Sequence, residues 1–364
     1  MTGGEKNIRV GLIGYGYAGK TFHAPLIQSV PGLQLTVVGS GRPDRVLADF
    51  PNVTICPPAA AAMHSDVDLV VIATPNDSHF PLASAALLSG KHVVVDKPFT
   101  VTLSEARSLV TLAEQQRRLL SVFHNRRWES ESLASKAILE SGMLGEVVHF
   151  EAHMDRYRPV VRQRWRENTG PGAGLWFDLG PHLIDQALYL FGLPETITAG
   201  FVTQRHGGQT DDWAHIRLNY QKLRVILHAS LLVSGGVPRS VLHGTRASWS
   251  KHGADVQERQ LVAGMRPGSV GFGVDPNPGI LYDGATGTQK EIPVPIGNES
   301  AYYIGIREAI MGRQPNPVPA EQALAVMAVL ERSFEAGAKE QTLSLNLTAQ
   351  EQAAFERSKG FPKP

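Results

Sequence analysis

Ile8–Gly19, with the sequence IRVGLIGYGYAG, is the stretch that decides the fold of this chain. Its first half is an apolar run of the length of one buried strand in a parallel sheet. Gly14, Gly16 and Gly19 follow in the spacing G-x-G-x-x-G. In such a loop the first glycine permits the turn out of the strand, the second lets a pyrophosphate approach the backbone, and the third lets a helix pack closely on the sheet. The pattern therefore predicts a loop that binds a dinucleotide.

The sequence around these glycines supports this interpretation. A helix is expected from Lys20 to Ser29, with its free N–H groups facing the anionic pyrophosphate. A second apolar strand is expected over Leu33–Gly39. The alternative is a glycine-rich turn with a purely structural role. The placement of the three glycines between a strand and a helix favours the cofactor loop. The residues between the three glycines are further candidates for cofactor binding, namely Tyr15, Tyr17 and Ala18.

The composition is that of an ordinary globular protein. The chain has 364 residues, more than one core usually contains, so two domains are expected. The formal net charge of +1 gives no electrostatic reason to expect a nucleic-acid or membrane partner. The single cysteine, Cys56, excludes an intramolecular disulfide and a multi-cysteine zinc site. The sequence shows no secretory signal and no apolar run of membrane-spanning length, so a cytoplasmic protein is expected.

Strands and helices alternate in the first third of the chain. A capping box, Thr102 with Glu105, begins one of these helices. Beyond the second strand, further strands are expected over Val53–Cys56, Asp68–Ile72, His92–Val95 and Leu119–Phe123. This alternation predicts an α/β fold with a doubly wound parallel sheet, the Rossmann fold, over residues 1–124.

Polar residues follow several of these strands. Ligands of doubly wound sheets bind beyond the carboxyl ends of the strands, so these residues are candidates for the site. They are Thr74, Pro75, Asn76 and His79 after the fourth strand, Lys97 after the fifth, and His124 after the sixth. For Lys97 the alternative is a solvated loop lysine, which is the commoner fate of this residue.

The hydrophobic period changes after about Phe123. Helices are expected over Glu129–Ser141, Ala301–Met311 and Ala320–Ala336. Longer strands are expected over Glu146–Asp155, Ile197–Gln204, Trp213–Asn219, Arg224–Val233 and Ser240–Trp249. This predicts a second, α+β domain with a largely antiparallel sheet over residues 125–364, whose C-terminal helix is a candidate to pack back on the first domain.

Two segments of this second domain carry candidate chemistry. Asp178 and His182 are four residues apart, so in a helix both side chains can face one site, where the histidine can move a proton. The alternative is an Asp178 that caps a helix and a His182 that belongs to the core. Arg156, Tyr157 and Trp165 lie in an arginine-rich segment suited to hydroxyls or phosphate. The alternatives there are an exposed charged loop or a single-stranded nucleic-acid surface, and the neutral net charge disfavours the latter.

Four motifs in order resemble the Gfo/Idh/MocA family of nicotinamide-dependent sugar and polyol dehydrogenases over nearly the whole chain. They are Gly14–Gly19, Ala73–Asn76 with His79, Asp96–Pro98, and Gly174 through Asp178 and His182 to Asp185. The family usually has glutamate where Asp96 stands. Within the family, His124–Trp128 and Asp155–Pro159 resemble the branch of NADP-dependent scyllo-inositol dehydrogenases and its uncharacterised relatives.

The resemblance implies that Lys97, Asp178 and His182 surround the reacting carbon. His182 is expected to take the hydroxyl proton as hydride leaves for the nicotinamide, and Lys97 to bind the same oxygen and contact the cofactor. Asp178 is expected to bind a neighbouring hydroxyl or to orient His182, and no metal is expected. His124, Arg156, Tyr157 and Trp165 are expected to contact substrate hydroxyls. The alternatives are a reductase of another sugar or of a 1,5-anhydro-sugar ketone, and a catalytically silent dinucleotide-binding regulator.

The end of the second strand predicts the cofactor. Dehydrogenases selective for NAD usually place a carboxylate there for the ribose 2′-OH. Here Ser40 and Arg42 follow instead, and the first carboxylate is Asp44. Because Ser40 and Arg42 can both bind a 2′-phosphate, NADP(H) is the expected cofactor, with NAD(H) possible. The alternative is that Arg42 points into solvent and Asp44 serves the ribose.

The strand Arg224–Val233 predicts self-association. Its apolar residues occupy both alternations, with Val225, Leu227, Ala229 and Leu231 on one and Ile226 and Leu232 on the other. Both faces of the second sheet are therefore expected to be partly buried. This predicts a homodimer or a higher homo-oligomer formed through that sheet, as related family members assemble.

Overall fold

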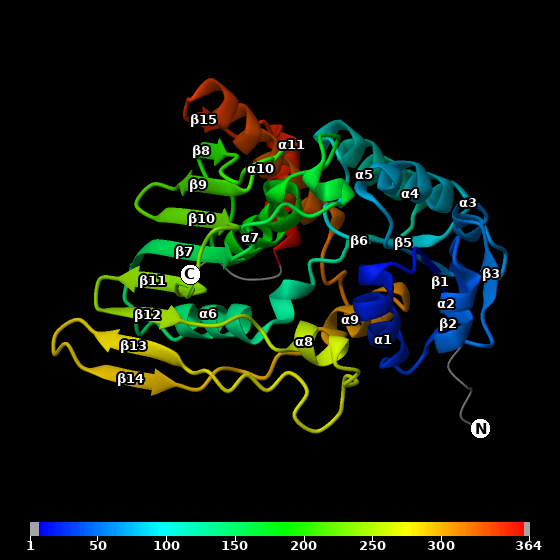
Figure 1. The fold of residues 1–364 in the computed structure, drawn as a ribbon, viewed down its shortest axis with the longest axis horizontal. Coiled ribbons are helices and arrows are strands. Elements are labelled where there is room, and N and C mark those ends of the chain that lie inside the picture. The colour runs from blue at the N-terminus through cyan, green and yellow to red at the C-terminus, as the bar shows by residue number, and fades with distance from the viewer. Residues whose placement is uncertain (1–6, 360–364) are drawn as a thin grey trace. The chain divides into compact units, whose positions relative to one another are not determined.

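The chain, described over residues 7–359 in this computed structural model, forms two compact units. The first unit contains the chain up to Asn125 together with Gln257–Phe272 and Asn298–Leu324. The second unit contains Arg126–Val256, Gly273–Gly297 and the chain from Ala325 onward. Each unit has one sheet of its own (Figure 1).

The first unit is built on a parallel sheet of six strands, drawn in blue to cyan in Figure 1, in the order β3-β2-β1-β4-β5-β6. The strands are β1 (Ile8–Ile13), β2 (Leu33–Gly39), β3 (Thr54–Cys56), β4 (Leu69–Ile72), β5 (His92–Val95) and β6 (Leu120–Val122). The chain runs outward from β1 to β3, then returns to pair β4 with the other side of β1. This is the doubly wound Rossmann arrangement that the sequence predicts.

Helices and turns of this unit follow from local sequence signals. All four residues of β4 are buried, as expected for a strand covered on both faces. Thr102 and Glu105 form the expected capping box at the start of α5. The helices are α1 (Ala24–Gln28), α2 (Pro43–Asp49), α3 (Pro58–Ala62), α4 (His79–Leu88), α5 (Leu103–Gln116), α8 (Gln257–Val262) and α9 (Ser300–Ile310).

The helix expected over Lys20–Ser29 is not a continuous α-helix. Gly19–His23 form a π-helical turn, and α1 begins only at Ala24. Pro25 lies in the first turn of α1, where its missing N–H costs nothing. In an α-helix begun at Lys20, the same proline would have removed an internal hydrogen bond, which explains the change of period.

The second unit is built on a mixed sheet of nine strands in the order β14-β13-β12-β11-β7-β10-β9-β8-β15. All pairs are antiparallel except β7 with β10, so the predicted largely antiparallel sheet is present. The strands are β7 (Val147–Asp155), β8 (Thr196–Val202), β9 (Trp213–Asn219), β10 (Arg224–Ser230), β11 (Ser240–Gly244), β12 (Ala247–Lys251), β13 (Gly279–Asp283), β14 (Gln289–Ile292) and β15 (Leu343–Ser344).

One predicted strand of this sheet is wrong. Ser240–Trp249 was expected to be continuous, but it is a hairpin in which Ser240 of β11 pairs with Lys251 of β12. Thr245 and Arg246, between the two strands, turn back over the loop before β7, where their amides bond to the carbonyls of Glu146 and Leu144. The apolar alternation on both sides of this short turn hid it in the sequence.

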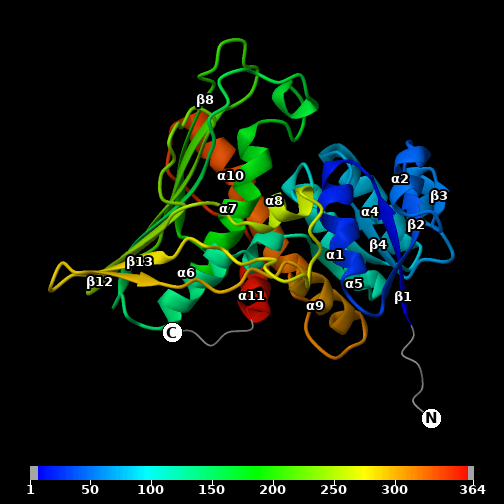
Figure 2. The same cartoon turned by 60° about the horizontal axis from the view of Figure 1, so that its bottom comes forward.

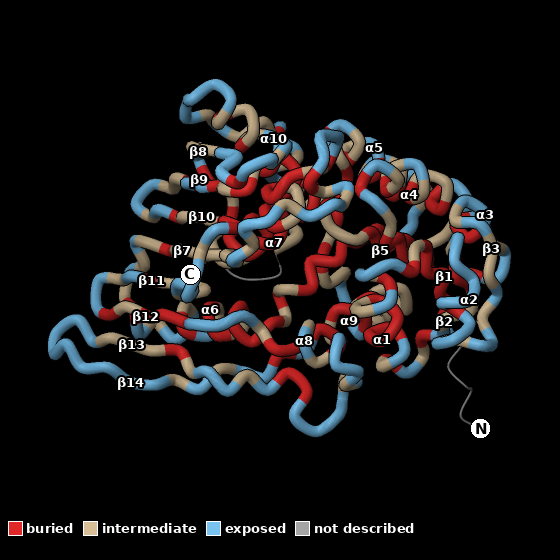
Figure 3. The backbone as a smooth tube through the Cα atoms, viewed as in Figure 1, coloured by how far each residue is buried: buried red, intermediate tan, exposed pale blue. Residues whose placement is uncertain are grey.

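The helices of the second unit cover one face of its sheet. They are α6 (Ser130–Glu140), α7 (Leu175–Phe191) and α11 (Ala349–Ser358), and α10 (Ala320–Lys339) begins in the first unit and continues into the second. In Figure 2 the sheet is seen nearly edge-on, with α6 and α7 on one side of it. Phe150 of β7 contacts Phe191 of α7, with ring centroids 5.2 Å apart. The strand positions that face these helices are buried, and Figure 3 shows burial along the backbone.

The side chains on the two faces of β10 differ in burial more than the sequence predicts. Val225, Leu227 and Ala229 are fully buried against the helices. Ile226 lies on the open face and is only partly buried in a single chain, and Leu232 is 37% exposed beyond the end of the strand.

None of the helices that the structure describes is long and apolar enough to cross a membrane.

Candidate active site

The glycine loop has the geometry that a dinucleotide loop requires. Gly14 has φ +94°, and a Cβ atom there would overlap the carbonyl oxygen of Ala73 at the end of β4. A Cβ atom at Gly19 would overlap the carbonyl oxygen of Gly14, so the turn closes on itself. At Gly16 nothing of the protein lies within 4 Å of such an atom. The loop is thus closed on the protein side and open at Gly16, which fits the approach of a pyrophosphate.

The residues between the glycines lie on both sides of the loop. Tyr15 is buried, and its hydroxyl donates to Asp49 at 2.7 Å, which fastens the loop to α2. Tyr17 is 61% exposed, and its hydroxyl donates to Glu258 of α8 at 2.8 Å. Ala18 is partly exposed and leads into the π-helical turn.

His79 joins the loops that follow β4 and β5. Its imidazole is fully buried, with Nδ1 2.8 Å from the carbonyl oxygen of Pro98 and Nε2 3.0 Å from that of Thr74. Burial lowers the pKa of His79. Thr74 also accepts a hydrogen bond from Ser78 at 2.6 Å, and Asn76 is buried while Pro75 is exposed. These contacts make Thr74–His79 a structured edge beside the glycine loop.

Lys97 follows β5 at the same edge of the sheet and is partly exposed. Its amide donates to the Asp96 carboxylate at 2.8 Å, and the Lys97–Pro98 peptide is cis. Burial raises the pKa of Asp96, but His23, whose Nε2 lies 3.9 Å from the carboxylate, and the Lys97 ammonium outweigh it and lower this pKa. An ionised Asp96 therefore lies directly beside Lys97. His124, at the end of β6, is buried.

The end of β2 carries the candidate residues for the cofactor's ribose. Ser40 is partly exposed, and its hydroxyl accepts the Arg42 amide at 3.1 Å. The Arg42 side chain is exposed, and so is Asp44, which lies in the first turn of α2.

In the second unit, α7 brings Asp178 and His182 one helical turn apart. The helix runs from Leu175 to Phe191 with Pro181 inside it, and its N-cap is Gly174. This excludes the alternative that Asp178 caps the helix. His182 is buried, with 6% of its surface exposed, and Asp178 is partly exposed. Both residues lie on one face of α7, as their spacing predicts.

Two residues outside α7 fix its first turn. Arg166 lies with its Nε 3.5 Å from an oxygen of the Asp178 carboxylate. Asp211 accepts the amide of Trp176 at 2.7 Å, and burial raises the pKa of Asp211 to about 6. Arg166 belongs to the arginine-rich segment, and its spacing from Asp178 in the sequence carries no signal that the two residues meet.

Asp185, the last residue of the family motif, has a structural role. Its carboxylate binds the Arg127 guanidinium at two points, 2.9 Å and 2.6 Å, and both side chains are buried. Arg127 also lies over the ring of Tyr189, 4.7 Å from its centroid. This pair ties the turn Asn125–Trp128 to α7.

The arginine-rich segment is less basic than its sequence indicates. Glu167 binds Arg164 at 2.9 Å and Arg205 at 3.1 Å, so part of the charge is neutralised locally. Arg166 lies 4.5 Å over the ring of Trp165. The proposed substrate contacts are accessible, because Trp165 and Tyr157 are exposed and Arg156 is partly exposed.

Each unit thus assembles its own part of the predicted site. The first gathers the glycine loop, Thr74–His79 and Lys97 at one sheet edge. The second gathers Asp178, His182 and Arg166 at the start of α7. A nicotinamide dinucleotide fits the first group, since the loop offers an open backbone at Gly16 and a helical turn begins at Gly19.

The chain is similar to known oxidoreductases along most of its length. Residues 8–124 match the NAD-binding Rossmann fold of the Gfo/Idh/MocA oxidoreductase family, and residues 136–345 match its C-terminal alpha/beta domain. The chain is 51% identical to the uncharacterized oxidoreductase YdgJ of Escherichia coli, over 93% of this chain and 99% of that one. It is 35% identical to the scyllo-inositol 2-dehydrogenase (NADP(+)) IolW of Bacillus subtilis, over 93% and 96%.

A solved structure of a Klebsiella pneumoniae protein superposes with a TM-score of 0.92 at 50% identity, covering 97% of this chain and 99% of that one. The strands of the six-stranded sheet all fall within the first matched range, and those of the nine-stranded sheet within the second. The chain therefore belongs to the Gfo/Idh/MocA family of oxidoreductases, with an NAD-binding Rossmann domain followed by the family's C-terminal alpha/beta domain.

Proposed function

We propose that this protein is a dehydrogenase that transfers hydride between a nicotinamide cofactor and a CH–OH group of a polyol or sugar. The observation that carries the proposal is the start of α7, where a carboxylate and an imidazole lie one turn apart. Scyllo-inositol and its ketone, scyllo-inosose, are the first substrates to test, because the relative IolW acts on scyllo-inositol.

The chain's own residues have distinct parts in the proposed reaction. The bound nicotinamide accepts the hydride during oxidation and supplies it during reduction. His182 takes the hydroxyl proton during oxidation and returns it during reduction, because an imidazole transfers protons near neutral pH. Lys97 donates a hydrogen bond to the reacting oxygen and stabilises its developing charge. Asp178, whose carboxylate lies beside Arg166, accepts a hydrogen bond from a neighbouring hydroxyl.

The side chains proposed to contact the rest of the substrate are chosen mainly for being accessible to it. Arg156, Tyr157 and Trp165 are proposed to bind the remaining hydroxyls. His124 is buried at the end of β6 and is proposed to contact the substrate from there. Tyr157 and Trp165 offer flat faces on which a sugar ring can pack, and the Tyr157 hydroxyl adds a hydrogen-bonding group.

The proposed cofactor is NADP(H), with NAD(H) as the weaker alternative. The exposed Arg42 guanidinium and the Ser40 hydroxyl stand directly after β2 and can bind a 2′-phosphate. Asp44 lies beyond Pro43 within α2 and is less well placed to bind a ribose hydroxyl. The relative IolW is named for its use of NADP(+).

A panel assay tests the reaction. The purified chain is given NADP⁺ or NAD⁺ with a set of inositols and sugars, and the reduced cofactors with their keto forms, while nicotinamide absorbance is recorded. Turnover of at least one polyol, with a higher kcat/KM for NADP(H), is the expected result. Preferred turnover of a 1,5-anhydro-sugar or other sugar ketone would make the chain a reductase of that class. Cofactor binding without turnover of any compound would favour a regulator and contradict the proposal.

A further inference from the structure

The open face of the nine-stranded sheet carries a row of histidines and carboxylates that the proposed reaction does not use. Alternation along β7 turns Phe150, Ala152 and Met154 toward the helices, where they are buried. The residues between them face the other way, namely His149, Glu151, His153 and Asp155. The every-second-residue spacing of these side chains is visible in the sequence.

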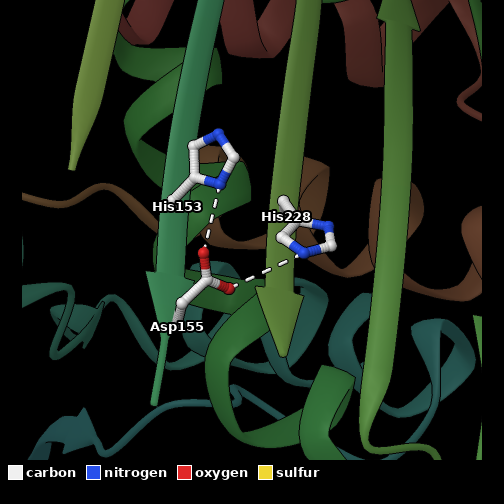
Figure 4. Close-up of side chains that lie close together, drawn as sticks. All are labelled: His153, Asp155 and His228. Carbon is white, nitrogen blue, oxygen red and sulfur yellow. Dashed lines mark hydrogen bonds and ion pairs between the residues drawn. The ribbon is translucent and has the colours of Figure 1, made fainter. Parts of the chain in front are cut away.

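Three side chains of this face converge on a common point. His228 on β10 pairs directly with His153 on β7, because the two strands are parallel neighbours. Nδ1 of His153 lies 3.2 Å from one oxygen of Asp155, and Nε2 of His228 lies 3.7 Å from the other. Figure 4 shows both imidazoles turned toward the carboxylate. The three ligand atoms all lie within 4.8 Å of one another.

Asp155 is the unusual member of the group. Only 5% of its side chain is exposed, and its Oδ1 has no hydrogen-bond partner among the residues that the structure describes. A buried carboxylate oxygen without a hydrogen bond is costly. The gap of 3.7 Å to His228 is too long for a hydrogen bond, but a cation bound to both atoms fills it.

A second layer of contacts orients the two imidazoles. His153 places its Nε2 3.1 Å from Glu151, which leaves Nδ1 directed at Asp155. Glu151 is itself held by His149 at 2.8 Å. His228 places its Nδ1 3.4 Å from His215 of β9, which leaves Nε2 directed at Asp155. Histidine ligands of metals are held in this way, with the second nitrogen bonded to a carboxylate or another polar group.

We propose that His153 Nδ1, the Asp155 carboxylate and His228 Nε2 bind a zinc-type divalent cation on the open face of this sheet. Two imidazoles and one carboxylate suit Zn²⁺ and its first-row neighbours, whereas Mg²⁺ and Ca²⁺ prefer oxygen ligands only. With metal–ligand bonds of about 2.0–2.2 Å, tetrahedral ligands lie roughly 3.3–3.6 Å apart, and small side-chain rotations reach this from the observed distances. The fourth position is left to water, since both imidazoles remain slightly exposed.

This site lies on the face of the sheet opposite α7. Phe150 packs on Phe191 of α7 from the covered face, while His153 and Asp155 project from the open face of the same strand. Zinc bound there does not touch Asp178 or His182. Metal binding and cofactor binding are therefore expected to be independent measurements on this protein.

Calorimetric titration of the full chain, free of any histidine tag and of chelator, with ZnCl₂ tests the proposal. One zinc ion per chain is expected. His228→Gln and Asp155→Asn should each weaken binding by tenfold or more, while His243→Gln, on the open face of β11 and outside the site, should leave it unchanged. Co²⁺ in place of Zn²⁺ should give a visible absorption that both site variants lose.

Melting temperatures establish whether each variant is folded. If Asp155→Asn is not folded, His228→Gln alone is enough to test the site. Absence of zinc binding to the wild-type chain would overturn the proposal. Binding that His228→Gln leaves as strong as in wild type would overturn it equally, because the cation would then be held by other surface groups.

Discussion

A single exposed arginine at the end of β2 carries the prediction of cofactor choice. Arg42→Ala is expected to raise KM for NADP(H) by about tenfold or more, while KM for NAD(H) changes little. The reason is that only NADP(H) presents a dianionic 2′-phosphate to the guanidinium. Steady-state kinetics with both cofactors measure this, and Asp44→Ala serves as the matched control on the neighbouring helix. Equal effects of Arg42→Ala on both cofactors would show that Arg42 points into solvent.

Another single residue, His92 at the start of β5, predicts a pH dependence of stability. Burial, and then the Arg118 charge, lower the pKa of His92 to about 4. Its Nδ1 accepts the Leu119 amide at 3.0 Å, so the neutral ring is the one that fits. The folded chain binds fewer protons than the unfolded chain between pH 6.5 and pH 4. This contribution to stability is complete above about pH 6.5 and is lost as the pH falls toward 4.

Replacement of His92 should remove that pH dependence. Between pH 7 and pH 5 the wild-type chain is expected to lose about 1–2 kcal/mol more unfolding free energy than His92→Gln. Urea unfolding at both pH values measures the difference, with His252→Gln on the surface as control. An identical pH dependence of wild type and His92→Gln would contradict the proposed role of this ring.

At the residue scale, the sequence predicts identities and spacings but not partners distant in the chain. The four-residue spacing of Asp178 and His182 placed both on one helix face correctly, because a helix fixes that geometry locally. The contact of Arg166 with Asp178 depends on how a loop folds back, and no local rule gives it. The convergence of His153 with His228 depends on the register of two strands that lie far apart in the sequence.

At the scale of elements, the glycine loop offers a matched pair of variants. Gly19→Ala should destabilise the protein by about 1–3 kcal/mol, because its Cβ atom overlaps the Gly14 carbonyl. Gly16→Ala should leave the melting temperature unchanged, because nothing lies within 4 Å of the new atom. It should nevertheless weaken NADP(H) binding roughly tenfold, since the methyl group stands where the pyrophosphate approaches.

Thermal melting and a cofactor-binding titration, performed on both variants, separate these two effects. Gly170→Ala, also in open space but in the second unit and outside the segments proposed to bind the cofactor, is the control. If Gly16→Ala binds NADP(H) as tightly as wild type, the loop does not hold the pyrophosphate.

Elements were predictable where a local signal marks them. The strand β5 and the capping box of α5 were placed at the correct residues, since an apolar run and the Thr102–Glu105 spacing mark them. The turn between β11 and β12 was missed because the alternation of side chains continues on both sides of it. The sequence of the π-helical turn Gly19–His23 resembles that of an ordinary helix. Pro25 is the local signal that an α-helix cannot run regularly from Lys20 through this point.

At the scale of the whole molecule, self-association through the nine-stranded sheet stays a prediction. Ile226 is partly buried and Leu232 is exposed, so apolar surface remains where a second copy could bind. A dimer or larger oligomer is expected at micromolar concentration, as measured by light scattering. Ile226→Lys should shift the mass toward that of the single chain. A wild-type monomer under these conditions would refute this part of the account.

Each of the two units contains segments that are far apart in the sequence. Gln257–Phe272 and Asn298–Leu324 belong to the first unit although they follow most of the second in sequence. Asn125, for example, donates to Glu299 at 2.6 Å across a separation of 174 residues. Contacts of this range depend on the folded topology, and neither periodicity nor a motif marks them.

The central claim is that this chain transfers hydride with His182 as the proton-transferring group. Reduction of scyllo-inosose, or of the best ketone in the panel, with NADPH deuterated on the transferred face of C4 tests it most directly. The account predicts one carbon-bound deuterium in each product molecule. It also predicts that His182→Ala and Lys97→Ala each lower turnover by about a hundredfold or more, with nearly unchanged NADPH binding by His182→Ala. Unlabelled product, or near-normal turnover in both variants, would contradict it.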